Sequence, residues 1–299
     1  MNKQVCAVVV TYNRKMLLVE SLNALLAQTY HVDRILIIDN ASTDGTAELL
    51  REKGFLDNSL IKYLPMSTNT GGAGGFREGI EWAYKNGFEW IWVMDDDTIA
   101  DPSALSELLL AHQRFDKEQQ PKLLASKVIW IDGSLHTMNG PAVKISDNES
   151  LILAAQHSTL SVRHTTFVST LLHKTAVQQY GLPIADYFIW VDDVEYTARI
   201  LRNEFGVLVP NSLVLHKTAK KHTWKDDNPA KAYYHVRNNV WMLTRSSAWS
   251  GKEKVKMAGS FLWHILTWLI NTRFRWASVR PILLGLKEGF FKVPKESVL

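Results

Sequence analysis

The stretch that most limits the fold of this chain is residues 90–101, where five apolar residues lead directly into three carboxylates. The apolar run is rich in β-forming residues and too short for a typical helix, so it predicts a buried strand. In an open α/β sheet, ligands bind outside the carboxyl ends of the strands. We therefore expect Asp95, Asp96 and Asp97 to face a ligand-binding crevice. The alternative is a solvated acidic turn before the next helix.

Asp95 and Asp97 are two residues apart, so in extended backbone their side chains would share one face. Two carboxylates on one side, with no Lys or Arg close by in the sequence, repel each other. A divalent cation relieves that repulsion, and oxygen ligands suit Mg²⁺ or Mn²⁺. His216, just past a later strand, is a candidate third ligand, although a lone His more often packs or caps.

Strand patterns alternate with helix patterns along the first half of the chain. Strands are expected at 5–10, 35–38, 61–64, 90–94 and 123–130, and later at 207–209 and 213–215. Helices are expected between the first four strands, at 102–114, at 176–180 and up to residue 202, with hairpins and loops at 131–165. This alternation predicts an α/β fold with a mainly parallel sheet flanked by helices. From residue 229 the pattern is helical, so we expect a catalytic domain at 1–228 and a helical region at 229–299.

Three further motifs carry polar groups suited to binding or catalysis. Asp39 follows a predicted strand and could accept a hydrogen bond from a base or a ribose, or form a simple Asx turn. Gly71–Gly75 could bring backbone N–H groups close to a phosphate at a helix start, although the motif fits neither common glycine-rich nucleotide pattern. Asp192 and Asp193 open a later helix. A carboxylate there could act as a general base or could complement the helix dipole.

Charge is distributed unevenly along the chain, whose net charge is +4. Residues 245–299 hold ten Lys or Arg against three Asp or Glu, together with several Trp and Phe. A basic and aromatic tail indicates nucleic acid or an anionic membrane surface, and its long apolar stretches favour the membrane. The longest uncharged stretch, 257–272, is short for a spanning helix. The single cysteine, Cys6, excludes an internal disulfide and fits a reducing cytoplasm, and no signal peptide is recognisable.

The apolar residues of 261–270 cover almost every side of a predicted helix. Such a helix is either wholly buried or partly immersed in lipid. Arg273, Arg275 and Arg280 follow at once, where they could meet anionic head groups. We expect peripheral membrane attachment, with a helix packed on the catalytic domain or in an oligomer interface as the alternative.

Taken together, the motifs resemble the inverting family 2 glycosyltransferases, which have the GT-A fold. The segments 8–14, 38–46 and 94–97 match successive motifs of that family. The segments 69–76, 190–193 and 233–238 resemble its galactofuranosyltransferase branch, and related rhamnosyltransferases share much of the pattern. The resemblance covers residues 4–245 in the same order. This branch tends to place Trp directly before its two acids, whereas Val191 intervenes here.

The resemblance implies a UDP-linked sugar donor and a Mn²⁺ or Mg²⁺ cofactor. It implies donor binding by Thr11, Asn13, Arg14, Asp39, Asn69, Gly71, Gly72, Asp95 and Asp96, and metal binding by Asp95, Asp97 and His216. It also implies that Asp193 is the general base, with Asp192 as the alternative. Trp190 and Asp192 would face the acceptor.

The implied acceptor is a saccharide or lipid-linked saccharide, met at the inner face of a bacterial cytoplasmic membrane during surface glycan synthesis. The favoured donor is UDP-galactofuranose, and the alternative is a dTDP- or UDP-linked rhamnose. The oligomeric state is left open, with a homo-oligomer among the alternatives. A nucleotidyltransferase would need basic side chains for a triphosphate, and the first 244 residues lack a basic phosphate loop. The rival of another class is a non-catalytic sugar-nucleotide-binding scaffold, against which the acidic residues and His216 argue. We expect no nucleic-acid partner.

Overall fold

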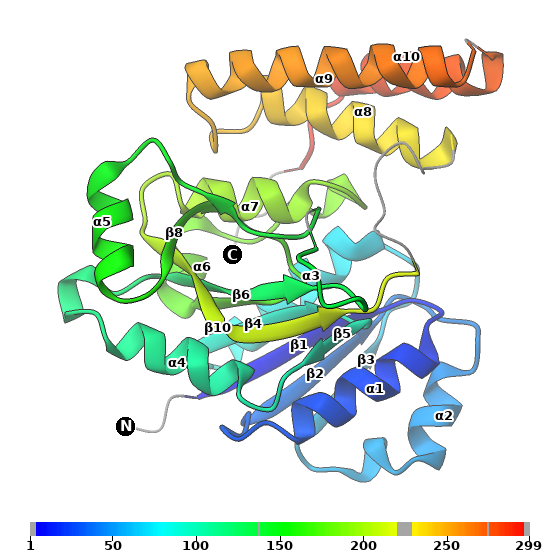
Figure 1. The fold of residues 1–299 in the computed structure, drawn as a ribbon. Coiled ribbons are helices and arrows are strands. Elements are labelled where there is room, and N and C mark those ends of the chain that lie inside the picture. The colour runs from blue at the N-terminus through cyan, green and yellow to red at the C-terminus, as the bar shows by residue number, and fades with distance from the viewer. Residues whose placement is uncertain (1–3, 137, 220–228, 274, 296–299) are drawn as a thin grey trace.

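The computed structural model describes residues 4–136, 138–219, 229–273 and 275–295. Ten strands form one sheet in the order β3-β2-β1-β4-β9-β6-β10-β8-β7, with β5 paired to β10. The strands are β1 Val5–Thr11, β2 Arg34–Asp39, β3 Ile61–Pro65, β4 Trp90–Asp95, β5 Thr98–Ala100, β6 Leu123–Ile129, β7 Ala142–Val143, β8 Leu160–His164, β9 Thr170–His173 and β10 Gly206–His216. The expected α/β class is confirmed, with helices on both faces of the sheet (Figure 1).

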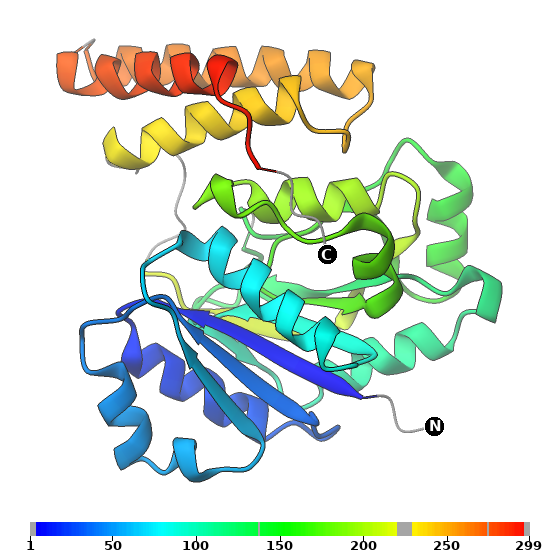
Figure 2. The same ribbon diagram turned by 180° about the vertical axis from the view of Figure 1, so that it is seen from behind.

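The helices of the first two thirds of the chain cover the sheet. They are α1 Lys15–Leu26, α2 Thr46–Glu52, α3 Gly71–Lys85, α4 Ala104–Gln113, α5 Asn148–Gln156, α6 Lys174–Tyr180 and α7 Asp192–Ile200. Helices α1 and α4 lie against one face (Figure 1), and α3 crosses the other, as the reverse view in Figure 2 shows. The sheet is therefore buried on both sides, which explains why its strands are near-continuous apolar runs.

Strand β1 lies at the centre of the core. Val5, Ala7 and Val9 belong to one buried cluster, whereas Cys6 and Val8 belong to the cluster on the opposite face. This division follows from the two-residue period of a strand. Each cluster also includes residues of the neighbouring strands and of the helices that cover the respective face. Cys6 is a free, buried thiol, in agreement with its position in the apolar run.

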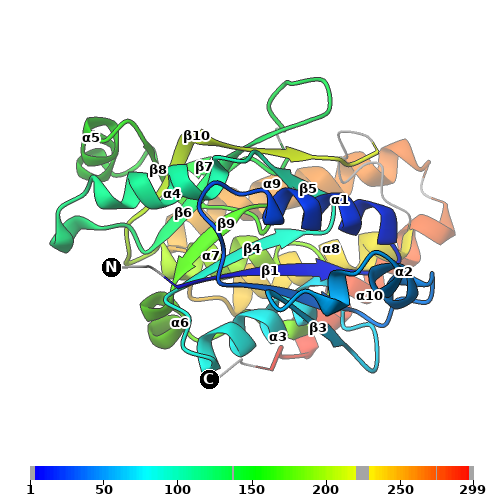
Figure 3. The same ribbon diagram turned by 90° about the horizontal axis from the view of Figure 1, so that it is seen from below.

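The first four strands pair in parallel, as their alternation with helices predicts. Beyond β4 the sheet becomes mixed, because β9 runs antiparallel to both β4 and β6. Figure 3 shows β4, β9 and β6 following one another across the sheet. The sequence pattern predicts neither β9 nor the short β5. Strand β5 pairs antiparallel with the end of β10 and aligns Thr98 with His216.

Two further expectations need correction. The sequence pattern predicts only hairpins and loops for residues 131–165, but they contain helix α5, whose N-terminus is capped by the Asp147 side chain accepting from the Ser150 N–H. It also predicts two strands at 207–209 and 213–215, but both segments belong to the single strand β10. Its register shifts between Val209 and Leu213, so three residues, including Pro210, bulge out of the pairing.

Helices α8 Pro229–Thr244, α9 Gly251–Asn271 and α10 Trp276–Phe291 form a separate layer beyond α7 (Figure 1). Their shared core includes Val236 and Val240 of α8, Phe261 and Trp268 of α9, and Ile282 of α10. The helical region expected from residue 229 is therefore present. The expected domain boundary itself adjoins residues 220–228, which lie outside the described part of the chain.

Helix α9 has one buried and one exposed apolar side, so it is not wholly buried. Phe261 and Trp268 face the other helices, whereas Leu262 and Trp263 are 64% and 63% exposed. Among the described residues, the structure contains no helix with the length and apolar character needed to cross a membrane. The apolar residues on the exposed side of α9 therefore form part of the protein surface.

Candidate active site

The Asp95–Asp97 cluster lies where β4 ends and the chain turns into β5. Asp95 is the last residue of β4, Asp96 and Asp97 form a turn, and β5 begins at Thr98. The shared-face argument from extended backbone is therefore wrong in its geometry. The carboxylates of Asp95 and Asp97 converge because the chain bends there.

The pairing of β5 with β10 brings His216 to this turn, 119 residues away in sequence from Asp97. The His216 Nε2 atom lies 2.9 Å from Asp97 Oδ1 and 4.0 Å from Asp95 Oδ2. One donor atom from each of the three residues lies within 4.8 Å of the other two. We call this group the β4 cluster. The structure thus brings together all three residues expected to hold a metal.

Arg14, at the end of the β1–α1 loop, supplies a cation that the sequence order had hidden. Its Nη1 atom lies 2.7 Å from Asp97 Oδ2 and 3.4 Å from Asp96 Oδ1. No Lys or Arg is close to these carboxylates in the sequence, but the fold brings Arg14 to them from 83 residues away. Burial acts to raise the pKa of Asp97, but hydrogen bonding from His216 and the charges of His216 and Arg14 outweigh it and lower that pKa.

The other two carboxylates of the turn behave differently from Asp97. Partial burial, followed by the charges of Asp97 and Asp96, raises the pKa of Asp95 well above its ordinary value. Burial also raises the pKa of Asp96 to about 6, against the opposing charge of Arg14. Thr11 donates its hydroxyl to Asp96 Oδ2 at 2.7 Å, and both side chains are buried. Asp96 therefore braces the end of β1, whereas Asp95 keeps 39% of its side chain in solvent.

Asp39, at the end of β2, is held by two partners. Its Oδ1 accepts the Ser42 N–H at 2.8 Å, which is the Asx-turn geometry, and its Oδ2 accepts the Tyr63 hydroxyl at 2.5 Å. Tyr63 comes from β3 and is not among the expected site residues. Its only sequence signal is its place in a strand next to β2. Burial and the hydrogen bond to Asp39 raise the pKa of Tyr63.

Asn13 connects the loops that follow β1 and β2. Its backbone N–H donates to Ser42 Oγ at 2.9 Å, and its side-chain oxygen accepts the Thr43 N–H at 2.7 Å. Asn13 adopts φ +53°, a left-handed conformation that Asn tolerates better than most residues. These bonds hold the two loops together beside the β4 cluster.

The glycine motif opens α3 and packs closely against its surroundings. Gly71 has φ +72°, and a Cβ there would lie 2.0 Å from the Phe188 carbonyl oxygen. The Gly71 N–H donates to Asn69 Oδ1 at 2.8 Å, so this amide already has a partner. At Gly72, by contrast, no atom of the described chain would lie within 4 Å of an added Cβ. Gly71 is therefore needed for packing, and Gly72 leaves open space for a ligand.

The second acidic group, Asp192 and Asp193, begins α7 as expected, and we call it the α7 pair. Trp190 and Val191 precede it with φ values of +71° and +60°. Burial, then the charge of Asp193, raises the pKa of Asp192 well above its ordinary value. Burial raises the pKa of Asp193 to about 6, against backbone N–H donors including Val194. Asp193 is therefore the acid of the pair that is more readily ionised near neutral pH.

The two acidic groups interact electrostatically. The charge of Asp193 is among those that raise the pKa of Asp95, so the α7 pair lies within electrostatic reach of the β4 cluster. Beside the α7 pair, the Lys231 ammonium lies 5.8 Å from the centre of the Trp190 ring. A cation thus lies over the aromatic ring that precedes the expected base in the chain.

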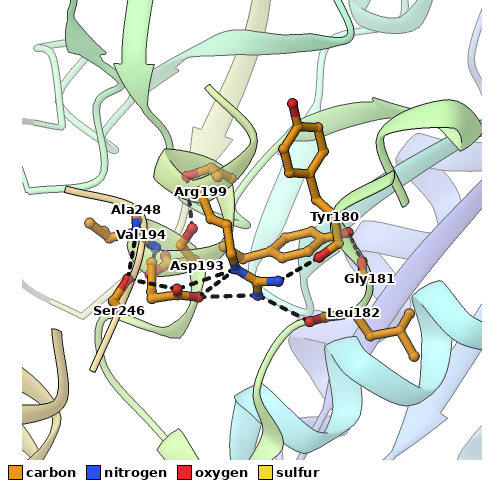
Figure 4. Close-up of polar contacts among 11 residues, drawn as sticks. Tyr180, Gly181, Leu182, Asp193, Val194, Arg199, Ser246 and Ala248 are labelled. Carbon is orange, nitrogen blue, oxygen red and sulfur yellow. Dashed lines mark hydrogen bonds and ion pairs between the residues drawn. The ribbon is translucent and has the colours of Figure 1, made fainter. Parts of the chain in front are cut away.

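The rear of α7 is fixed by a buried ion pair, which Figure 4 shows together with Asp193. Arg199 Nη2 lies 3.2 Å from Glu195 Oε2, and the Arg199 guanidinium donates to the carbonyls of Tyr180 and Leu182 at 2.5 and 3.1 Å. Ser246 donates to Glu195 Oε1 at 2.8 Å. These contacts border a cavity of ≈ 460 Å³. Arg199 and Glu195 are only four residues apart, but sequence reasoning missed their role because the other partners, Tyr180, Leu182 and Ser246, are distant in sequence.

A mixed sheet with helices on both faces and an Asp-x-Asp turn beside its central strands defines a GT-A architecture. Residues 6–119 match the family described as glycosyl transferase family 2. The chain is 27% identical to galactofuranosyltransferase GlfT1 of Mycobacterium tuberculosis over 98% of each chain. The chain therefore carries a family 2 glycosyl transferase domain and is a glycosyltransferase.

Solved structures of low sequence identity share the fold. The structure of S. aureus TarS residues 1–349 in complex with UDP-GlcNAc matches 97% of this chain and 82% of that chain, with a TM-score of 0.64 and 14% identity. The mannosyltransferase PcManGT from Pyrobaculum calidifontis, in complex with GDP-Man and Mn²⁺, matches 96% of this chain and 87% of that chain. Its TM-score is 0.56 and its identity 14%.

Proposed function

We propose that this protein transfers galactofuranose from UDP-galactofuranose to a hydroxyl of a saccharide or lipid-linked saccharide, with inversion at the anomeric carbon. The observation that carries this proposal is the similarity to galactofuranosyltransferase GlfT1 along 98% of the chain. Electrostatics support it, because the charge of Asp193 in the α7 pair acts on Asp95 in the β4 cluster. One acidic group would bind a metal ion for the diphosphate of the donor, and the other would remove the proton of the acceptor hydroxyl.

The donor atoms of the β4 cluster fit a divalent ion. Two carboxylate oxygens and one imidazole nitrogen within 4.8 Å suit Mn²⁺ or Mg²⁺. The His216 Nδ1 atom has no hydrogen-bond partner among the described residues, so the imidazole can adopt the tautomer that leaves Nε2 free to bind a metal. A bound ion would stabilise the negative charge on the departing nucleoside diphosphate. We assign Asp95, Asp97 and His216 to this site.

The residues around the β4 cluster would hold the donor. We propose that the polar groups at the ends of β1 and β2 and at the start of α3 hold the nucleotide and the diphosphate. These residues are Thr11, Asn13, Arg14, Asp39, Asn69, Gly71, Gly72 and Asp96. Several of these residues already form hydrogen bonds or ion pairs with one another. Together they would therefore form a preorganised surface for the donor. Arg14 can in addition pair with a diphosphate oxygen, because its side chain is 52% exposed.

Asp193 would remove the proton from the acceptor hydroxyl as that oxygen attacks the anomeric carbon. Its place at the N-terminus of α7 favours the ionised carboxylate, and burial keeps it basic enough to accept a proton. Asp192, with the higher pKa, would remain protonated and face the acceptor together with Trp190. The aromatic face of Trp190 provides a surface on which a sugar ring can pack.

A donor screen tests this proposal directly. The protein would be incubated with Mn²⁺, a saccharide acceptor and either UDP-galactofuranose or dTDP-rhamnose, and nucleotide release and product configuration would be measured by NMR. We expect transfer of galactofuranose with inverted configuration. Transfer of rhamnose alone would replace the donor assignment, and no transfer from any donor would contradict the proposed function.

We further propose that residues 229–299 attach the catalytic domain, residues 1–228, to the inner face of the cytoplasmic membrane. The exposed side of α9 and α10 includes Leu262, Trp263, Leu283 and Phe290. Arg273, Arg275 and Arg280 are exposed between and on these helices. An aromatic and aliphatic surface beside basic residues is typical of interfacial membrane binding. It would also bring the site to a lipid-linked acceptor.

Flotation with anionic liposomes tests this attachment. Each Lys or Arg near an anionic surface contributes about 1 kcal/mol, so replacing the three arginines by Ala should weaken binding roughly 10²-fold at low salt. The control is a triple replacement of exposed Arg51, Lys53 and Lys62, which belong to α2, its C-terminal cap and β3. Both elements lie on the opposite side of the molecule from α9 and α10 (Figure 1). Equal recovery of wild type and the arginine variant, or no binding by either, would favour an oligomer interface instead.

A further inference from the structure

The loop that leads into α7 has a backbone that few sequences adopt. Between the 3₁₀ helix Ala185–Tyr187 and α7, Phe188, Trp190 and Val191 have φ values of +63°, +71° and +60°. A left-handed conformation is unfavourable for bulky residues, and above all for a β-branched residue such as Val191. Such a loop persists only where its surroundings hold it in place. This loop also carries Trp190 and determines where α7 begins.

Asn238 of α8 holds this loop by its carbonyl groups. Its side chain is fully buried, and its Nδ2 atom lies 2.9 Å from Tyr187 O, 2.8 Å from Ile189 O and 3.0 Å from Trp190 O. Three carbonyls thus surround one amide group. Carbonyls in an irregular buried loop need such donors, because they have no partners within a helix or a sheet.

Arg237 fixes the direction in which the Asn238 amide points. Its Nε and Nη2 atoms donate to Asn238 Oδ1 at 3.0 and 2.9 Å, so the amide nitrogen faces the loop. Arg237 Nη2 also donates to the Asp186 carbonyl at 2.6 Å and the Tyr187 carbonyl at 3.0 Å. Both residues belong to the 233–238 motif of the sequence.

On its opposite side, the loop is held by the first turn of α3. The Ala73 N–H, in the first turn of α3, donates to the Phe188 carbonyl at 3.2 Å. The Val191 carbonyl accepts the Glu195 N–H within α7. Every carbonyl from residue 186 to residue 191 therefore has a donor. The loop is thus hydrogen-bonded to α8 on one side and to α3 on the other.

We propose that Asn238 is a positioning residue, which through this loop places Asp193 and Trp190 for the reaction. The assignment rests on the proposed function, because it takes Asp193 as the base. Asn238 itself touches neither donor nor acceptor. It fixes the angle at which the chain enters α7, and it connects the C-terminal helices to the base. Catalysis is sensitive to such placement, because a displacement of about 1 Å can reduce turnover about 10²-fold.

The test replaces Asn238 by Asp, which has nearly the same shape but presents an accepting oxygen to the three carbonyls. We expect kcat to fall about 10²-fold, while the Kd for UDP changes less than about threefold. Hydrogen exchange should become faster in the peptide covering residues 186–194. Asn239→Asp is the matched control, because among the described residues its amide donates to the His235 carbonyl of its own helix, at 2.8 Å, and to no carbonyl of the loop. That control should keep both kcat and protection.

Asn238→Ala, which removes the donors without adding a charge, carries the same expectations if the Asp variant does not fold. A double variant separates positioning from general destabilisation. If Asn238 acts through Asp193, Asn238→Asp combined with Asp193→Asn should be no slower than Asp193→Asn alone, because residues that act as a unit are not additive. Losses that multiply would overturn the proposal, and so would unchanged kcat in Asn238→Asp.

Failure of the proposed function would be recognised separately. A wild-type protein that transfers no sugar would contradict the glycosyl-transfer assignment. The exchange measurement would still decide whether Asn238 holds the loop. Equal hydrogen exchange of residues 186–194 in the wild type and the Asn238→Asp variant would contradict the proposal that Asn238 holds this loop.

Discussion

The β4 cluster and the α7 pair both crowd carboxylates together, but they offset the charge in different ways. In the β4 cluster, Asp97 has two cationic or hydrogen-bonding partners, His216 at 2.9 Å and Arg14 at 2.7 Å. In the α7 pair, the groups that favour ionisation of Asp193 are backbone N–H donors, from the start of α7 and from Phe167. The first arrangement keeps a carboxylate ionised and ready to bind a cation. The second keeps a carboxylate able to accept a proton.

This difference shows how one protein can use the same residue type for two tasks. A metal ligand has to remain charged, so a low pKa helps it. A general base has to take up a proton near neutral pH, so a moderately raised pKa helps it. If the comparison is correct, variants of the two groups should fail in different ways, the first in donor binding and the second in turnover.

The largest effect should come from the β4 cluster. We expect Asp97→Ala to reduce kcat/KM on the order of 10⁴-fold and to weaken UDP binding in Mn²⁺, because the diphosphate loses its counter-charge. Asp116→Ala, at an exposed acid, is the control. Steady-state kinetics and calorimetry with UDP measure both quantities. Undiminished wild-type activity in excess chelator would show that the β4 cluster does not act by binding a metal.

The next effect should come from the α7 pair, with a different signature. Asp193→Asn keeps the shape of the side chain and its capacity for hydrogen bonding but removes its basicity. We expect kcat to fall about 10³-fold, with UDP affinity nearly unchanged. Asp192→Asn should have a smaller effect on kcat. If Asp192→Asn alone shows the large loss, the base is displaced by one residue.

The fold was largely predictable because its signals are local. Apolar runs and helical periodicity located the first four strands and the helix that begins at Asp192, and a strand that ends in three Asp located the β4 cluster. The sequence did not reveal β9, because Thr170–His173 is short and lacks an alternating pattern. It hid the continuity of β10, because Pro210 interrupts the strand pattern.

The partners of the site residues were harder to predict than the residues themselves. Arg14 was identified by resemblance, but its pairing with Asp97 spans 83 residues and depends on the packing of β1 beside β4. Tyr63 and Asn238 act on Asp39 and on the 186–191 loop through contacts that no local pattern encodes. Long-range hydrogen bonds of this kind follow only from the assembled sheet and helices.

A smaller effect should appear in the pH dependence. Burial raises the pKa of Asp193 to about 6. The base works only when ionised, so kcat/KM should rise about tenfold per pH unit below pH 6 and level off above it. A pH–rate profile at constant Mn²⁺ measures this. The residual activity of Asp193→Asn should lack this rise, and a profile that keeps it would assign the titration to another group.

The smallest effect should be a change in thermal stability on metal binding. It distinguishes the β4 cluster from the α7 pair without a sugar-transfer assay. A ligand that binds only the folded protein stabilises it, by about 2.7 kcal/mol at a hundredfold excess over Kd. In a chain of this size we expect excess Mn²⁺ to raise Tm by a few degrees, roughly 2–5 °C. Asp193→Asn should show the same shift as wild type, and Asp97→Ala should show none. A shift that persists in Asp97→Ala would place Mn²⁺ elsewhere. A shift lost in Asp193→Asn would mean that the two acidic groups hold the ion together, so that they form one site with a single task.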